Sequence, residues 1–331
     1  MADQALKLRQ LQAARIAEQE RRKRDVKLAS TAGVGAALAP PEKQTGAASS
    51  TPTMRTRRRR ARVIAVTSGK GGVGKTVITA NLALSFAMSN RRVMLLDADF
   101  GLANLDVVLG LSAKTNIRDV VFGQASIGDV IIEGPEGLRL IPAGSGIRAL
   151  ADLTQLQVKG IFDEAVGYDE SVDVFLIDTA AGIAAGVAGI LLSADEIVIV
   201  AEPEPTAVLD AYAVIKTLVS KRPDASVYVV ANCVASEEQG LTVFSNLQTV
   251  AARFLSKELV YLGSIPEDPR LVDAVRMRKP SLTEFPNCCF SIAIRKLART
   301  LDGLDRKECR LGGGISGFFS RMLNGDVHEC T

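Results

Sequence analysis

A glycine-rich loop constrains the fold of this chain more than any other sequence feature. It reads Gly69-Lys70-Gly71-Gly72-Val73-Gly74-Lys75-Thr76 and matches the phosphate-loop pattern GxxxxGK[ST]. An apolar segment, Val63–Thr67, precedes it, and a helical pattern, Val77–Ser89, follows it. Glycines allow a backbone to close around phosphate groups, and the N–H groups that begin the helix face the anion. The sequence therefore predicts a strand, a phosphate-binding loop and a helix in that order.

The loop implies a nucleotide and a magnesium ion. Lys75 is expected to reach the β- and γ-phosphates, and the Thr76 hydroxyl is expected to bind Mg²⁺. The predicted nucleotide contacts are Gly69, Lys70, Gly71, Gly72, Val73, Gly74, Lys75, Thr76 and Val77.

The chain after the loop alternates short apolar segments with helical patterns. The predicted strands beyond the first are Val93–Asp97, Leu138–Pro142, Val172–Asp178, Glu196–Ala201, Val227–Ala231 and Val260–Ile265. A clear helix is predicted at Pro205–Val219, and the apolar run Ala180–Leu192 is predicted to be a buried helix. This alternation is typical of an α/β fold with a doubly wound, mostly parallel sheet and helices on both faces.

Composition divides the chain into four regions. Residues 1–28 are predicted to be helical, 29–61 a flexible basic linker, 62–302 the nucleotide-binding domain, and 303–331 a tail. Residues 1–62 contain 15 of the 40 Lys and Arg residues but only five of the 37 acidic residues. A basic arm therefore precedes an acidic domain, as in proteins that contact an acidic partner, nucleic acid or lipid.

Two predicted strands end in aspartate. Asp97 and Asp99 follow Val93–Leu96, and Asp178 follows Val174–Ile177. Because strand carboxyl ends line the ligand crevice of an open α/β sheet, these carboxylates are expected beside the phosphate loop. The predicted metal-binding residues are Thr76, Asp97 and Asp178, with Asp97 holding the water shell of Mg²⁺.

The second lysine of the loop indicates a narrower class. Lys70 gives the sequence KGGVGKT, which resembles the deviant phosphate loop of MinD and ParA ATPases. This resemblance implies that Lys70 crosses a dimer interface to the partner's nucleotide. It also implies that Asp99 orients the attacking water and that Asp178 is the Walker B carboxylate, so Asp99, Lys70 and Lys75 are the predicted catalytic residues.

The adenine pocket is inferred from the same resemblance. Asn232 follows a predicted strand, and an amide there is expected to read the adenine edge. Pro266, Glu267 and Asp268 are expected to close over the base. Each of these residue types is also common in turns, so a structural role remains open.

Two further motifs resemble the FlhG (FleN) family of flagellar regulators. Asp3-Gln4-Ala5-Leu6-Lys7-Leu8-Arg9 matches its DQAxxLR motif. The residues Glu202-Pro203-Glu204-Pro205-Thr206, continued by Asp210-Ala211-Tyr212, also resemble this family more than MinD or ParA. The resemblance implies that Asp3, Gln4, Ala5, Leu8 and Arg9 contact an FlhF-type GTPase. It also implies ATP-dependent homodimers, flagellar basal-body components and a flagellar transcription regulator as further partners.

The tail contains one apolar helix face. The spacing predicts that Ile315, Phe318, Phe319, Met322 and Leu323 share this face. It suits an anionic membrane surface, and it equally suits docking on the parent domain. No apolar signal segment follows Met1, so we expect a cytoplasmic protein at the inner face of the membrane.

The alternative function is a DNA-partitioning ATPase of the ParA kind, in which the basic arm contacts DNA. A nitrogenase-type reductase is disfavoured because no cysteine lies between Lys75 and Asn232, where cluster ligands would fall. We assign no role to Cys288-Cys289 or to the Arg57–Arg60 run.

Overall fold

The computed structural model describes residues 60–99, 104–143, 164, 166–304 and 313–324, all within the compact unit Arg57–Thr331. The predicted helix at 1–28 and most of the predicted linker at 29–61 lie outside the described residues.

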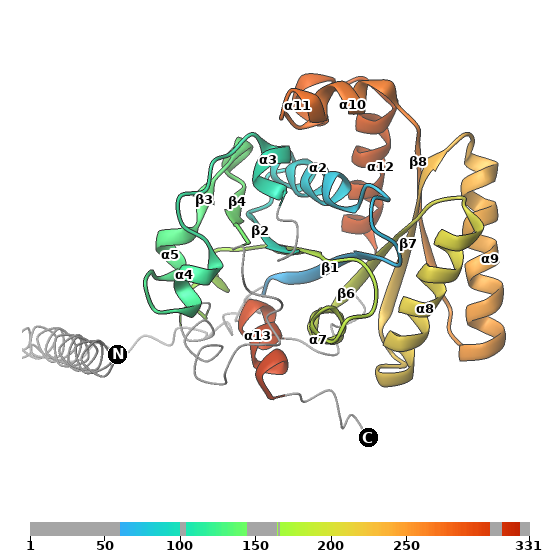
Figure 1. The fold of residues 1–331 in the computed structure, drawn as a ribbon, viewed down its shortest axis with the longest axis horizontal. Coiled ribbons are helices and arrows are strands. Elements are labelled where there is room, and N and C mark those ends of the chain that lie inside the picture. Colours follow the sequence, from blue (N-terminus) through green and yellow to red (C-terminus); the bar gives the residue numbers. More distant parts are fainter. Residues whose placement is uncertain (1–59, 100–103, 144–163, 165, 305–312, 325–331) are drawn as a thin grey trace, which may run out of the picture. The chain divides into compact units, whose positions relative to one another are not determined.

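Eight strands form a single sheet in the order β3-β4-β2-β5-β1-β6-β7-β8 (Figure 1). All neighbouring strands are parallel except for the pair β3–β4 at one edge. The strands are β1 (Arg62–Ser68), β2 (Val93–Ala98), β3 (Ile132–Glu133), β4 (Arg139–Ile141), β5 (Val174–Thr179), β6 (Glu196–Ala201), β7 (Ser226–Val234) and β8 (Val260–Pro266). The predicted doubly wound fold is confirmed.

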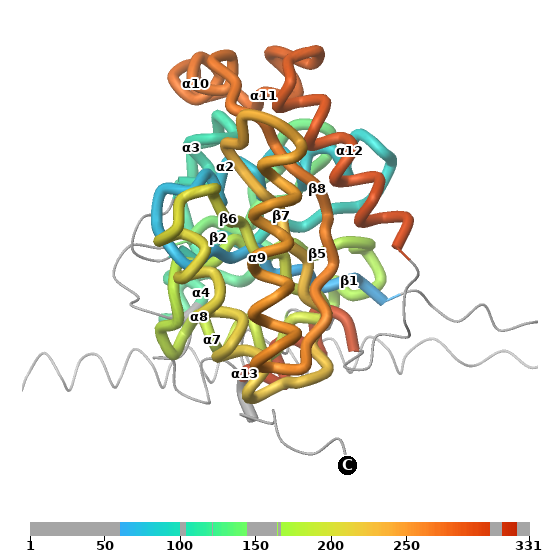
Figure 2. The backbone as a smooth tube through the Cα atoms, turned by 90° about the vertical axis from the view of Figure 1, so that its right-hand side faces the viewer, coloured from blue at the N-terminus to red at the C-terminus, as the bar shows by residue number. Residues whose placement is uncertain are grey.

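Helices cover both faces of the sheet (Figures 1 and 2). On one side lie α2 (Lys75–Met88), α3 (Leu105–Leu109), α10 (Pro269–Arg276), α11 (Ser281–Glu284) and α12 (Cys289–Gly303). On the other lie α4 (Ile117–Val121), α5 (Ile127–Val130), α7 (Ala185–Ser193), α8 (Pro205–Lys221), α9 (Glu237–Leu255) and α13 (Gly314–Asn324). Short 3₁₀ turns, η1 (Pro135–Gly137) and η3 (Val166–Tyr168), complete the described elements.

The central strand β1 supplies both hydrophobic cores. Val63 and Ala65 point into the core under α7, α8 and α13, whereas Ile64 and Val66 point into the core under α2 and α12. Successive side chains of a strand alternate between faces, so a strand buried on both faces must be apolar throughout. The phosphate loop therefore begins from the middle of the sheet, on a rigid support.

Two differences from the sequence predictions have local causes. The edge strand β3 was not predicted, because a two-residue antiparallel pairing leaves no periodic pattern. The run Ala180–Leu192 is helical only from Ala185, because Gly182 has a φ of 88° and its N–H donates to the Ser68 carbonyl at 2.9 Å. Residues before Ala185 therefore form a loop beside the phosphate loop.

No helix within the described ranges is long and apolar enough to cross a membrane.

Candidate nucleotide site

The phosphate loop connects β1 to α2 and requires glycine at defined positions. Gly72 and Gly74 have positive φ angles of 84° and 78°. A Cβ atom at Gly69 would lie 2.1 Å from the carbonyl carbon of Asp210, inside van der Waals contact. A Cβ at Gly71 or Gly72 would meet nothing within 4 Å, so this side of the loop is open to a ligand.

Asn232 holds the phosphate loop from β7. Its side-chain Nδ2 donates to the Val73 carbonyl at 2.9 Å, and the residue is buried. A Cβ atom at Gly74 would lie 2.7 Å from the same Nδ2 atom, so a side chain at this position would clash with Asn232. No local sequence pattern indicates this bond, since it joins residues 159 apart. Adenine recognition by Asn232 stays a prediction.

Lys75 forms an ion pair with Asp178. Lys75 Nζ donates to Asp178 Oδ1 at 2.8 Å, and both side chains are almost fully buried. Burial raises the pKa of Asp178, while the ammonium of Lys75 and the hydroxyls of Thr76 and Thr79 oppose that rise. A bound phosphate would offer Lys75 another anionic partner.

Asp97 lies beside Asp178 and organises the start of α3. The two aspartates are register partners in β2 and β5. The Asp97 carboxylate accepts hydrogen bonds from the backbone N–H groups of Asp99 (3.1 Å), Asn104 (3.2 Å) and Leu105 (3.3 Å). Burial, followed by the neighbouring charge of Asp178, raises the pKa of Asp97 to about 7. A divalent cation between these carboxylates would relieve the repulsion.

The residues present fit a magnesium ion. Asp178 Oδ2 is buried and accepts no hydrogen bond from the described residues, so it is available to a cation or to its water shell. Thr76, Asp97 and Asp178 meet at this point, and carboxylate and hydroxyl oxygens are ligands that Mg²⁺ prefers. Bound Mg²⁺ would neutralise charge on the phosphates. Asp99 follows the last residue of β2 and is partly exposed, and its catalytic role stays a prediction.

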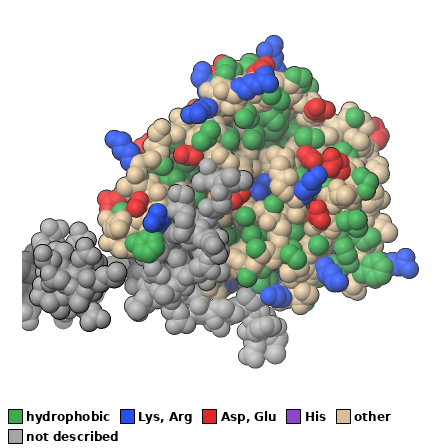
Figure 3. Space-filling model, in the orientation of Figure 1, with side chains coloured by type: hydrophobic (Ala, Val, Ile, Leu, Met, Phe, Trp, Pro, Cys, Tyr) green, Lys and Arg blue, Asp and Glu red, His purple; other side chains and the backbone are tan. Residues whose placement is uncertain are grey.

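The second lysine of the loop has an acidic partner on its own chain. Lys70 Nζ lies 2.9 Å from Glu204 Oε2, and both side chains are exposed. This bond raises the pKa of Lys70. Acidic side chains surround a basic one over the upper part of α8 in Figure 3. Lys70 is therefore paired with an acidic side chain of its own chain, Glu204.

The predicted adenine loop is anchored rather than free. Asp268 accepts hydrogen bonds from the N–H groups of Arg270 and Phe290, each at 2.9 Å. Its carboxylate thus caps the starts of both α10 and α12. Pro266 and Glu267 lie at the end of β8, where the Glu267 N–H donates to the Val234 carbonyl at 3.3 Å. The Asp268 side chain has a structural role that the sequence analysis left open, and base contacts by this loop stay a prediction.

The tail helix α13 docks on the domain through its apolar face. Ile315, Phe318 and Phe319 are buried, and Met322 packs against the same core. The Phe318 ring lies edge-on to Phe175 of β5, with centroids 6.0 Å apart. Of the two locations left open by the sequence, the structure shows docking on the parent domain. The side chain of Leu323 lies outside the described residues.

Polar contacts fix both ends of α13. Asp169 accepts hydrogen bonds from the N–H groups of Ile315 (2.6 Å) and Ser316 (3.2 Å), so it caps the first turn from another segment of the chain. At the other end, Arg321 donates to the Ser193 carbonyl of α7 and lies 3.6 Å from Asp195. Asp169 and its capping role were not foreseen from the sequence, because the contact spans 146 residues.

The predicted partner-binding residues Asp3, Gln4, Ala5, Leu8 and Arg9 lie outside the described residues.

The chain is similar to several known proteins. A family model described as an AAA domain matches residues 61–223. Antiactivator FleN of Pseudomonas aeruginosa is 42% identical over 240 residues, covering 72% of this chain and 86% of FleN. Flagellum site-determining protein YlxH of Helicobacter pylori is 39% identical, covering 78% of this chain and 89% of YlxH. Among solved structures, MinD of Pyrococcus horikoshii with Mg-ADP has a TM-score of 0.62 and 27% identity, covering 74% of this chain and 97% of that one.

The fold and the phosphate loop, together with these relatives, define the chain as a P-loop ATPase of the MinD/ParA type. Enzymes of this class hydrolyse ATP. Within this class, the chain belongs to the FlhG/FleN family.

Proposed function

We propose that this chain is a flagellar regulator that alternates between an ATP-bound homodimer and an ADP-bound or nucleotide-free monomer. Its relatives are named an antiactivator and a flagellum site-determining protein, which supports the flagellar role. In this proposal, binding of ATP and Mg²⁺ closes the dimer, and Lys70 moves from Glu204 to the nucleotide of the partner subunit. The tail helix is then released and binds anionic lipid at the inner face of the cell membrane.

Helix α7 lies between the nucleotide loops and the tail helix α13, and this position is the main support for the proposal. Immediately before α7, the Gly182 N–H bonds to the Ser68 carbonyl, and the Ser68 hydroxyl bonds to the Lys70 carbonyl at 2.9 Å. At the end of α7, the carbonyl of its last residue, Ser193, accepts a hydrogen bond from Arg321 of the tail helix. A shift of the loop on ATP binding would therefore act directly on the docking site of α13.

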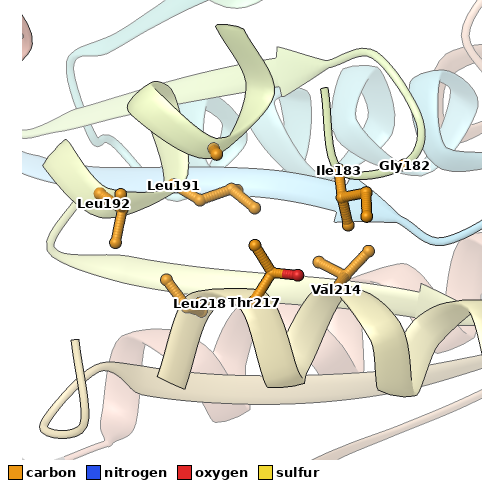
Figure 4. A pocket seen from close by; sticks show the side chains of 8 residues that line it. Gly182, Ile183, Leu191, Leu192, Val214, Thr217 and Leu218 are labelled. Carbon is orange, nitrogen blue, oxygen red and sulfur yellow. The ribbon is translucent and has the colours of Figure 1, made fainter. Parts of the chain in front are cut away.

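The other side of α7 leaves room for such a shift. A small apolar cavity lies between α7 and α8, with Leu191 and Leu192 on one side and Val214 and Leu218 on the other (Figure 4). A helix bordered by a cavity loses fewer contacts when it moves than one that is packed on every side. This packing supports α7 as the moving element.

Hydrogen exchange tests the release of the tail. The Ile315 and Ser316 amides are bonded to Asp169 in the docked state, so they should be protected with ADP. In the Asp99→Ala protein with ATP, we expect α13 to exchange at least about tenfold faster, since local opening sets exchange. Amides of α12 serve as the internal control. Equal protection of α13 in both nucleotide states would contradict the proposal.

The partner proposal has its own test. The match at Asp3–Arg9 and its place ahead of a long linker support stimulation of an FlhF-type GTPase by this segment. The intact protein should raise the GTPase rate of the cognate FlhF-type protein, and Gln4→Ala should remove this effect while leaving ATP hydrolysis unchanged. A matched change outside the motif, Gln12→Ala, should keep the effect. If the GTPase rate stays the same at saturating amounts of the unsubstituted protein, the proposed partnership is wrong.

A further inference from the structure

A buried threonine that no motif includes touches the Walker B aspartate. Thr79 lies on α2 one turn after Lys75 and is fully buried. Its Oγ1 lies 2.9 Å from the Lys75 carbonyl and 3.1 Å from Asp178 Oδ1. Bonding to the carbonyl four residues earlier is common for helical threonine, whereas the contact with a buried carboxylate at the metal site is particular to this position.

The two oxygens of Asp178 have different surroundings. Oδ1 contacts both Lys75 Nζ, at 2.8 Å, and the Thr79 hydroxyl. Oδ2 is buried and has no hydrogen-bond partner among the described residues. A buried carboxylate oxygen without a partner is costly, so this atom is the one suited to Mg²⁺ or to a water of its shell.

Nucleotide binding is expected to remove two of the groups beside Asp178. Lys75 would turn to the phosphates and Thr76 would turn to Mg²⁺. Thr79 is fully buried, so its hydroxyl is not expected to meet the phosphates or the metal ion. The single proton of this hydroxyl can go to the Lys75 carbonyl or to Asp178 Oδ1, so Thr79 would then be the side-chain donor still available to Oδ1.

We propose that Thr79 is a positioning residue for Asp178, whose hydroxyl holds Oδ1 while Oδ2 faces the magnesium ion. This role rests on the magnesium–nucleotide site described above. Residues that orient metal-binding carboxylates typically change metal affinity by 10- to 100-fold when they are replaced. The role is thus distinct from that of Thr76, whose own hydroxyl is the expected metal ligand.

The test compares three variants of the full-length protein. Thr79→Val removes the hydroxyl and keeps the volume, and Thr79→Ser restores the hydroxyl. Thr217→Val is the matched control, because the Thr217 hydroxyl donates to the carbonyl four residues earlier, at 2.9 Å, and makes no hydrogen bond to a carboxylate among the described residues. The readouts are the affinity for fluorescently labelled ADP with and without Mg²⁺, and the Mg²⁺ concentration that gives half-maximal ATP hydrolysis.

We expect Thr79→Val to raise that Mg²⁺ concentration roughly tenfold and to lose most of the Mg²⁺-dependent tightening of ADP binding. Affinity for ADP without Mg²⁺ should stay unchanged, and Thr79→Ser and Thr217→Val should behave like the unsubstituted chain. Equal Mg²⁺ dependence in Thr79→Val would overturn the proposal. So would an equal loss of metal-free ADP affinity, which would assign Thr79 to the shape of the loop. If the unsubstituted chain responds to no Mg²⁺ at all, the magnesium site itself is wrong, and the role of Thr79 with it.

Discussion

Replacing Asp99 by alanine should lower the rate of ATP hydrolysis by about 100-fold or more while ATP still binds. The phosphate loop and Lys75 are unchanged in this variant, so the contacts to the phosphates remain. What is lost is a carboxylate at the end of β2 that can orient the attacking water, and positioning supplies most of the rate in phosphoryl transfer. The measurement is steady-state phosphate release together with ATP affinity.

Asp97→Asn is the control for Asp99→Ala, because Asp97 also lies at the end of β2 but is expected to support Mg²⁺ rather than to orient the attacking water. Asp97→Asn should weaken Mg²⁺-dependent nucleotide binding and loosen the start of α3, because the Asp97 carboxylate accepts three backbone N–H groups there. Turnover at the normal rate in Asp99→Ala would remove Asp99 from catalysis. Loss of ATP binding in that variant would instead assign Asp99 to the binding site.

Replacing Phe318 by alanine should release the tail from the domain without any nucleotide. Phe318 is fully buried and contacts Phe175, and truncation of such a ring typically costs roughly 3–5 kcal/mol, or more than about 100-fold in the docking equilibrium. The expected result is rapid hydrogen exchange across α13 in the ADP state. Phe254→Ala, which truncates a phenylalanine that is 64% exposed on α9, should leave exchange in α13 unchanged.

The same burial limits how the membrane contact can be tested. Substitutions at Phe318 and Phe319 alter both the docked state and the face that would meet lipid, because these are the same side chains. Asp169→Asn separates the two effects, since it weakens the cap of α13 and leaves the apolar face intact. It should favour release and raise lipid binding. Docking as tight as in the unsubstituted chain would show that the cap contributes little.

The fold followed closely from the sequence because its strands are buried on both faces. Segments such as Glu196–Ala201 are apolar after their first residue and bounded by loops, and the predicted and observed limits of that strand coincide. The helix after the phosphate loop was likewise predicted within two residues at its start and one at its end. Edge strand β3, with one antiparallel neighbour and two residues, had no comparable pattern.

The site was predictable where its residues follow one another in the chain. The phosphate loop and the aspartates that end β2 and β5 form local patterns, and the structure brings them together. Thr79, Asp169 and the loop-holding role of Asn232 depend on contacts between segments 99 to 159 residues apart. For Thr79 one signal was available, since a helical residue four positions after Lys75 lies on the same face as the lysine. Nothing in the local sequence marks Asp169 as the cap of a distant helix.

The most direct test of the switch is co-sedimentation of the Asp99→Ala protein with anionic liposomes. In the proposed switch, two released tails on one dimer would bind the same surface together, so the second contact would be effectively intramolecular and marginal helices would gain avidity. We expect most of the Asp99→Ala protein to sediment with anionic liposomes when ATP and Mg²⁺ are present, and little of it with ADP. With neutral liposomes we expect little sedimentation with either nucleotide. Equal lipid binding with ATP and ADP, or none with either, would contradict it.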